Sequence, residues 1–215
     1  MSVKLGTFNK RSEQLDGTPQ WRAIVLSVHG INTTGPWQKS ISPVLNDSAF
    51  KTVGADYGFH LLRIARPKSL LKRAKAAIWE LYEKHHGANL PFCAIGHSFG
   101  TLALGSLMMD NRDAQFDRVI LTGSILARDF NWKNLIDAGQ VNSILNEVSK
   151  NDAIVKKCWM LKVISPSLAV GRSGSHGFLD GCERVRQRYH SMGHSEVLND
   201  VACKKTWIPF LRSEG

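Results

Sequence analysis

Short apolar runs, separated by polar segments that contain Gly and Pro, are the dominant pattern along the chain. Residues 23–28 read Ala-Ile-Val-Leu-Ser-Val, and this nearly continuous apolar run is typical of a strand buried on both faces of a parallel sheet. Segments of strand length that are rich in apolar residues predict further strands at 59–64, 91–95, 118–121, 141–145 and 184–189.

Helical periodicity occupies the segments between these runs. Residues 67–86 show it most clearly, with Pro67 suited to a first helical turn and Gly87 suited to a stop. Shorter helices are predicted at 37–50, 101–109 and 131–138, and another after Ser195, which is placed to act as its N-cap. Strands that alternate with helices predict an α/β fold of three layers, with a mostly parallel central sheet and ligands at the carboxyl ends of its strands.

The length and composition fit one globular domain spanning residues 1–215, with residues 1–20 as a polar edge strand or arm. The chain has 215 residues, of which 43% are hydrophobic and 21% charged. It contains no apolar run long enough to cross a membrane and no apolar signal-peptide core near its start, so a cytoplasmic location is expected. Its four cysteines form no CxxC motif, which argues against a zinc ribbon or a redox pair.

The segment from Gly96 to Gly100 reads Gly-His-Ser-Phe-Gly, between an apolar strand and an apolar helix. A G-x-S-x-G motif in this context presents its serine on a sharp, strained turn, where the two glycines avoid collisions. The N–H groups that open the following helix then point toward developing negative charge. Ser98 is therefore the candidate nucleophile, and an ordinary Gly-rich turn is the alternative interpretation.

A second motif, Val28-His29-Gly30-Ile31, follows the first buried strand directly. Together with the serine motif, it makes the chain resemble a compact α/β-hydrolase of the serine esterase and lipase type. The resemblance implies an oxyanion hole formed by the N–H groups of Phe99 and Ile31. The segment between residues 121 and 141 is short, so no cap domain is expected. His29, which is expected to hold the loop, and Asn32 are candidates to line the substrate site.

The family's chain order, Ser then Asp or Glu then His, directs attention to the two late loops. Asp152 follows the strand predicted at 141–145 and is the candidate acid, and the alternative interpretation is that it only caps a helix starting near Ala153. His194, in the loop after the last strand, is the candidate base and is preferred over His190. Weaker candidates are Asp129, Asp137 and Asp180 for the acid, and His97 and His176 as residues that line the substrate site.

The net charge of +10 changes this picture only at the surface. Basic residues gather at 63–75 and alternate at 184, 186 and 188, which fits either a solvated surface or a patch for an anionic surface. No nucleic-acid module is present, so nucleic acid is not expected as a partner. The predicted function is hydrolysis of a small-molecule or lipid ester through an acyl-enzyme, with no cofactor and no metal.

Two other functions remain open on the sequence. One is a phospholipase or lipase that docks on anionic membranes through its basic face. The other is an α/β-hydrolase fold used as a binding module without turnover. The sequence sets neither the acyl group nor the oligomeric state.

Overall fold

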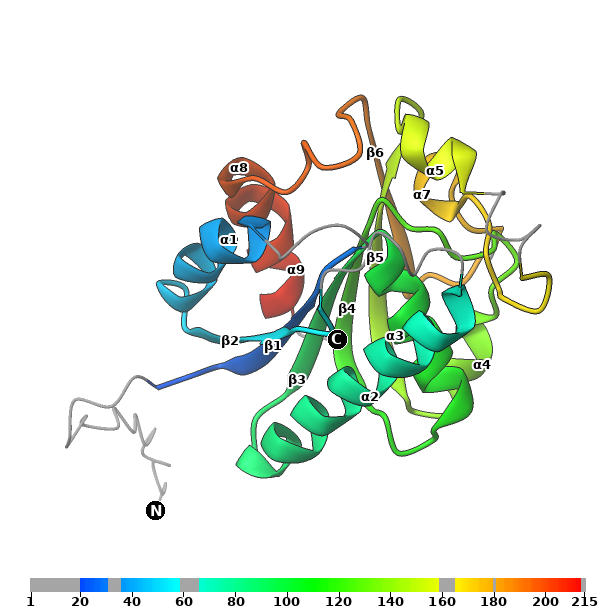
Figure 1. The fold of residues 1–215 in the computed structure, drawn as a ribbon. Helices are drawn as coiled ribbons and strands as arrows, with labels where there is room; N and C mark the ends of the chain where they lie inside the picture. Colours follow the sequence, from blue (N-terminus) through cyan, green and yellow to red (C-terminus); the bar gives the residue numbers. More distant parts are fainter. Residues whose placement is uncertain (1–19, 31–35, 59–65, 159–164, 180, 214–215) are drawn as a thin grey trace, which may run out of the picture.

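A six-stranded parallel sheet forms the centre of the computed structural model, which describes residues 20–30, 36–58, 66–158, 165–179 and 181–213. The strand order is β2-β1-β3-β4-β5-β6 (Figure 1). The strands are β1 (Ala23–Val28), β2 (Phe50–Ala55), β3 (Phe92–His97), β4 (Phe116–Thr122), β5 (Val141–Ser149) and β6 (Val185–His190).

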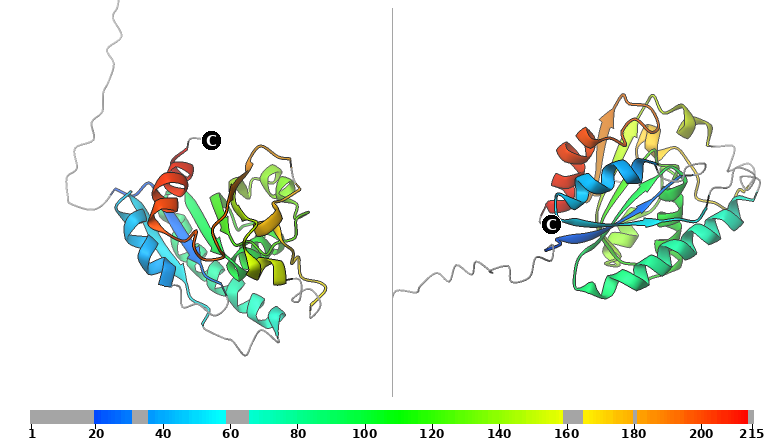
Figure 2. Two further views of the ribbon diagram at one scale, coloured as in Figure 1. Left: turned by 90° about the horizontal axis from the view of Figure 1, so that it is seen from above. Right: turned by 60° about the vertical axis from the view of Figure 1, so that its left-hand side comes forward.

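Helices cover both faces of this sheet, as the two views of Figure 2 show. One face packs against α2 (Pro67–His85), which continues into the turn η2 (His86–Ala88), and against α3 (Phe99–Asp110), α4 (Trp132–Asp137), α5 (Ala153–Lys157) and α7 (Ser173–His176). The other face packs against α1 (Pro36–Asn46), α8 (Asp200–Ala202), the π-helical turn η3 (Cys203–Trp207) and α9 (Ile208–Arg212).

The central strands are apolar throughout because each supplies both hydrophobic cores. In β1, Ile24 and Leu26 belong to the core under α2 and α3, whereas Val25 belongs to the core under α1 and α9. In β3, Ala94 faces the first core and Ile95 faces the second. This alternation follows from the two-residue repeat of a strand and confirms the predicted three-layer arrangement. Within the described ranges, no segment forms a separate cap domain.

The order of the strands fixes where a ligand site can form. The chain passes from β1 outward to β2 and then returns through α2 to β3 on the other side of β1. A crevice opens between neighbouring loops where the strand order reverses in this way, at the carboxyl ends of the strands. Gly30, just after β1, and Ser98, just after β3, therefore lie at the edge where the topology favours a site.

Three of the predicted elements are wrong in their bounds by several residues. The strand predicted at 141–145 extends to Ser149. The helix predicted at 37–50 ends at Asn46, and Phe50 begins the edge strand β2, whose half-exposed sequence Phe-Lys-Thr-Val-Gly-Ala lacks an apolar run. The last helix is capped by the side chain of Asn199, which accepts from the Ala202 N–H at 2.9 Å, and not by Ser195. The strand predicted at 59–64 and nearly all of the polar segment 1–20 lie outside the described residues.

No helix in the described part of the chain has the length and apolarity needed to span a bilayer.

Candidate active site

Ser98 occupies a strained turn between β3 and α3. Its φ of 54° and ψ of −119° place a residue with a side chain in a region that L-amino acids rarely adopt. Hydrogen bonds on both sides hold this conformation: the Ser98 N–H donates to the Thr122 carbonyl at 2.9 Å, and the Thr101 N–H donates to the Ser98 carbonyl at 3.0 Å. The turn leaves the Ser98 side chain partly exposed at the carboxyl edge of the sheet.

Neighbouring atoms pack closely against both glycines of the motif, and at Gly100 the nearest of these are backbone atoms. A Cβ atom on Gly100 would lie 2.4 Å from the Val28 carbonyl oxygen, and one on Gly96 would lie 2.8 Å from Leu104 Cδ1. Gly30 plays the same part in the neighbouring loop, because its Cβ would lie 2.9 Å from the Ser98 Cβ. These contacts bring the loop after β1 directly against the serine turn.

Asp152 and His194 form a close hydrogen-bonded pair at the same edge of the sheet. The distance from His194 Nδ1 to Asp152 Oδ2 is 2.7 Å, and the Asp152 side chain is only 2% exposed. The other carboxylate oxygen, Oδ1, accepts from the Val155 N–H at 2.8 Å and caps α5. Asp152 therefore caps α5 through one oxygen and contacts His194 through the other, so the cap does not compete with the contact to the candidate base.

The ring of His97 packs against the ring of His194. The two ring centroids lie 4.6 Å apart, and His97 Nδ1 lies 3.0 Å from Thr122 Oγ1. Burial, reinforced by the neighbouring His194, lowers the pKa of His97 from 6.5 to about 3. His97 is thus a neutral wall of the site. Among the described residues, Ser98 Oγ has no hydrogen-bond partner, and His194 does not hydrogen-bond to it directly. His194 is linked to the serine turn through its contacts with His97, the residue before Ser98, and with Gly123.

The buried, neutral His97 makes a testable contribution to the pH dependence of stability. Above pH 6.5 the ring is neutral in the folded and unfolded chain, whereas between pH 6.5 and about 3 only the unfolded chain binds the proton. The contribution of His97 to the free energy of unfolding should therefore decrease as the pH falls from 6.5 to about 3, by up to about 1.4 kcal/mol per pH unit. Urea unfolding of wild type and His97→Gln at several pH values measures this contribution. Parallel pH profiles of the two proteins would contradict it.

Gly123, directly after β4, is a site residue that the sequence did not reveal. It has a φ of +52°, and a Cβ there would lie 2.6 Å from His194 Cε1, 2.8 Å from His194 Nδ1 and 3.4 Å from Asp152 Oδ2. The absence of a side chain at Gly123 thus makes room for the Asp152–His194 pair. The only signal in the sequence was its position at the carboxyl end of a central strand.

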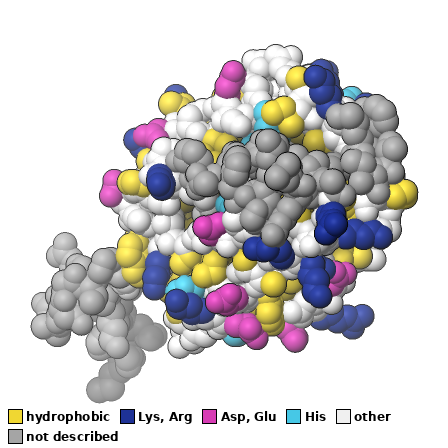
Figure 3. Space-filling view, in the orientation of Figure 1, with side chains coloured by type: hydrophobic (Ala, Val, Ile, Leu, Met, Phe, Trp, Pro, Cys, Tyr) yellow, Lys and Arg dark blue, Asp and Glu magenta, His cyan; other side chains and the backbone are white. Residues whose placement is uncertain are grey.

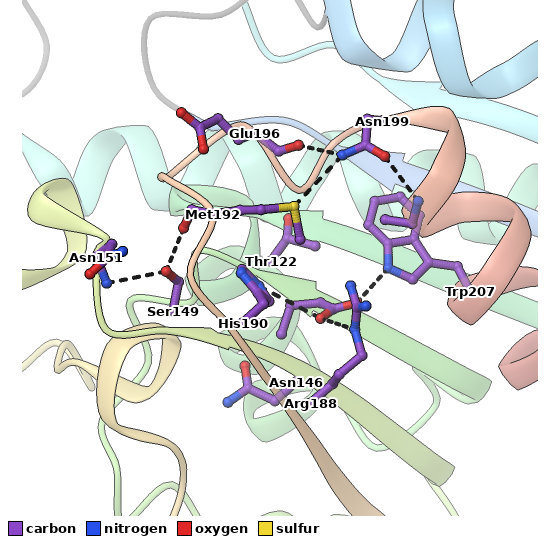
Figure 4. Close-up of polar contacts among 12 residues, drawn as sticks. Thr122, Asn146, Ser149, Asn151, Arg188, His190, Met192, Glu196, Asn199 and Trp207 are labelled. Carbon is purple, nitrogen blue, oxygen red and sulfur yellow. Dashed lines mark hydrogen bonds and ion pairs between the residues drawn. The ribbon is translucent and has the colours of Figure 1, made fainter.

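The loop that carries His194 is tied to the loop that carries Asp152 (Figure 4). Ser149 Oγ donates to the Met192 carbonyl, and Asn151 Nδ2 donates to the Ser191 carbonyl at 2.8 Å. Further along, the Gly193 N–H donates to Glu196 Oε2 at 2.7 Å. The hydrogen bonds across the two loops fix the start of the His194 loop relative to the end of β5.

Buried Glu147 forms an ion pair with half-buried Arg188 near these loops, and His190 lies against the same carboxylate. Glu147, whose side chain is fully buried, accepts from Arg188 Nε at 2.7 Å and from Trp207 Nε1 at 2.8 Å (Figure 4 labels Arg188 and Trp207). His190 Nε2 lies 3.7 Å from Glu147 Oε2, and burial lowers the pKa of His190. The hydrogen bond to Asp152 is made by His194, the preferred candidate base, and His190 faces Glu147.

Glu147→Ala should lower the free energy of unfolding by about 3 kcal/mol, because the partly buried guanidinium of Arg188 then loses the carboxylate with which it pairs. This value is the low end of the range for broken buried pairs, since the Arg188 side chain is 34% exposed. The double variant Glu147→Leu with Arg188→Leu removes both charges and should recover much of the loss. Guanidinium unfolding of the three proteins provides the measurement. Equal losses in the single and double variants would contradict a role for the pair.

The remaining predicted residues fall into four groups. Phe99 is the first residue of α3, where its N–H lacks a helical acceptor, whereas Ile31, Asn32 and Asp180 lie outside the described residues. His29 is buried, stacks on Tyr57 at 4.2 Å and has a structural place under its loop. The last three residues form no hydrogen bond with His194 in the described part of the chain. Asp129 is exposed, Asp137 pairs with Lys133, and His176 ends the short helix α7.

Comparison with known proteins identifies the fold. No protein-family model and no curated protein sequence matches the chain. A soluble variant of monoglyceride lipase from Saccharomyces cerevisiae, solved with a substrate analog, has a TM-score of 0.59 at 9% identity, covering 93% of this chain and 90% of that one. Est1E from Butyrivibrio proteoclasticus has a TM-score of 0.56 at 14% sequence identity, and the match covers 91% of this chain and 90% of that one. A thermostable carboxyl esterase from Bacillus coagulans, solved with glycerol, has a TM-score of 0.54 at 13% sequence identity, and the match covers 89% of this chain and 88% of that one. The chain has the α/β-hydrolase fold, as predicted.

Proposed function

We propose that this protein is a serine hydrolase that cleaves an ester through an acyl-enzyme, with Ser98 as nucleophile, His194 as general base and Asp152 as the orienting acid. The observation that carries the proposal is the 2.7 Å hydrogen bond between His194 and buried Asp152, formed beside a serine held at a φ of 54°. The esterases and the lipase that share the fold support the reaction class.

In the first half of the reaction, Ser98 Oγ attacks the ester carbonyl carbon while His194 Nε2 takes the hydroxyl proton. The new oxyanion is stabilised by the Phe99 N–H and, by resemblance, the Ile31 N–H. Collapse of the tetrahedral intermediate breaks the bond to the alcohol, which leaves with the proton that His194 had taken. Asp152 keeps the Nδ1 proton on the imidazole and stabilises its positive charge.

In the second half, water attacks the acyl carbon and His194 takes a proton from it. The bond between the acyl carbon and Ser98 Oγ then breaks, the carboxylic acid leaves, and His194 returns the proton to Ser98. Neutral His97, packed against His194, supports this cycle because it adds no competing positive charge beside the imidazolium. The cycle as proposed needs no cofactor and no metal.

A fluorophosphonate probe tests the proposal directly, because it reacts covalently only with an activated serine. The folded wild-type protein should be labelled, Ser98→Ala should not be labelled, and neither should His194→Ala beyond a trace. A known serine hydrolase under the same conditions serves as the positive control. A folded wild type that stays unlabelled while the control reacts would contradict the proposal and would favour a binding module without turnover.

A further inference from the structure

A basic hollow lies beside the loop that carries Asp152. Its volume is about 290 Å³, and it opens between α5, α7 and the end of β6. We call it the basic hollow, and the residues that line it are Arg128, Lys150, Lys156, Ser175, His176 and Tyr189. An adjacent hollow of about 520 Å³ shares Lys150 and Tyr189 and extends to Asn151, His190 and Ser191.

The charges of the basic hollow have one sign. Arg128, Lys150 and Lys156 are three cationic residues of its lining, and no Asp or Glu lines it among the described residues. Within the same part of the chain, none of the three forms an ion pair. Arg128 is held in place instead by backbone carbonyls, with Nε donating to Gly177 at 3.0 Å and an Nη atom donating to His176 at 3.3 Å. The guanidinium is therefore positioned without being neutralised.

The cations of the basic hollow lie close enough together to affect His176, which is also part of the lining. Burial and then the charges of Arg172, Arg128, Lys156 and Lys150 lower the pKa of His176. The His176 ring is therefore neutral near pH 7, and its Nδ1 lies 2.7 Å from Ser175 Oγ. Mutual repulsion of this kind is relieved when an anion enters, because each cation then gains an opposite charge.

Two hydroxyl residues accompany the cations in the lining, Ser175 and Tyr189. The Ser175 hydroxyl donates to the Arg172 carbonyl at 3.2 Å, so Tyr189 is the hydroxyl donor left for an anion. Several cations combined with a hydroxyl donor match an oxyanion that carries more than one negative charge and several acceptor oxygens. Figure 3 shows Lys and Arg side chains at the surface on the side of the molecule where Figure 1 places α5.

We propose that the basic hollow is a binding site for a phosphate-type oxyanion, carried either by the ester substrate or by a separate small ligand. The basic hollow and the adjacent hollow are lined by residues that directly precede the Asp152 and His194 loops of the candidate active site. Lys150 is two residues before Asp152, and the adjacent hollow reaches Ser191, whose carbonyl accepts from Asn151. Binding itself does not depend on hydrolysis, and only the version in which the substrate carries the anion rests on the proposed function.

Calorimetric titration with inorganic phosphate tests the site. Wild type should show saturable binding that weakens as sodium chloride is added, because exposed charges are screened. Lys150→Ala and Lys156→Ala should each weaken binding about tenfold, since each removes a charge-assisted contact. Lys68→Ala and Lys72→Ala, which remove exposed lysines of α2, are the matched controls and should bind as wild type does. The proposal is overturned if millimolar phosphate shows no saturable binding, or if all four variants weaken it equally.

Kinetics then distinguish the two sources of the anion. If the substrate carries it, phosphate should compete with an aryl ester that bears a remote phosphate group, and it should leave hydrolysis of the neutral aryl acetate unchanged. If a separate ligand carries it, phosphate should change kcat for the neutral acetate without competing with it. The titration repeated on Ser98→Ala keeps the two proposals apart, because phosphate binding should persist there whether or not Ser98 is the nucleophile.

Discussion

Asp152→Asn should lower kcat for ester hydrolysis by about 10³- to 10⁴-fold and leave the protein folded. The reason lies in the two oxygens of Asp152, one of which caps α5 through the Val155 N–H while the other faces His194 Nδ1. In the variant, the cap requires the amide oxygen, so the amide NH₂ is turned toward His194. The imidazole must then present an unprotonated Nδ1, which places its proton on Nε2, and the ring can no longer take the proton of Ser98.

Steady-state kinetics on a neutral aryl ester, combined with urea unfolding, check this prediction. Asp152→Ala should lose activity to a similar degree and should also lose about 1 kcal/mol of stability, because the cap disappears. Asp137→Asn changes an exposed carboxylate that pairs with Lys133 and should leave kcat unchanged. A kcat for Asp152→Asn within tenfold of wild type would exclude Asp152 as the group that orients His194.

Gly123→Ala should lower kcat about 100-fold, which is the scale expected when a catalytic group is misplaced by up to 1 Å. The added Cβ would lie 2.6 Å from His194 Cε1, so the imidazole has to move away from its place beside the serine turn. The substitution also carries the cost of a side chain at a φ of +52°, about 1 kcal/mol of stability.

Gly139→Ala separates these two effects. Gly139 has a φ of +72°, and a Cβ there would meet nothing within 4 Å, so only the backbone strain remains. Its stability loss should therefore resemble the strain component at Gly123, with kcat unchanged. Kinetics and thermal unfolding of both variants provide the comparison. An equal fall in kcat for both would show that strain, and not contact with His194, is responsible.

The central strands and the serine turn were predictable because their causes are local. Strands buried on both faces must be apolar at nearly every position, and the run at β1 shows this directly. The edge strand β2 was missed for the opposite reason, since one neighbour and partial exposure remove the need for an apolar run. A helix cap is equally hard to assign when two polar residues are close, and Asn199 rather than Ser195 fills that role.

The amino-acid sequence by itself determined the central strands, the fold class and the strained position of Ser98, because periodicity and the glycine spacing act over a few residues. It also narrowed the candidate acid and base to Asp152 and His194. Only the tertiary structure shows which oxygen of Asp152 faces His194 and that a side chain at position 123 would collide with the His194 ring. It alone also shows that the cations around His176 line one hollow. These contacts join residues distant in the chain, and the packing of strands and loops that brings them together leaves no local pattern in the sequence.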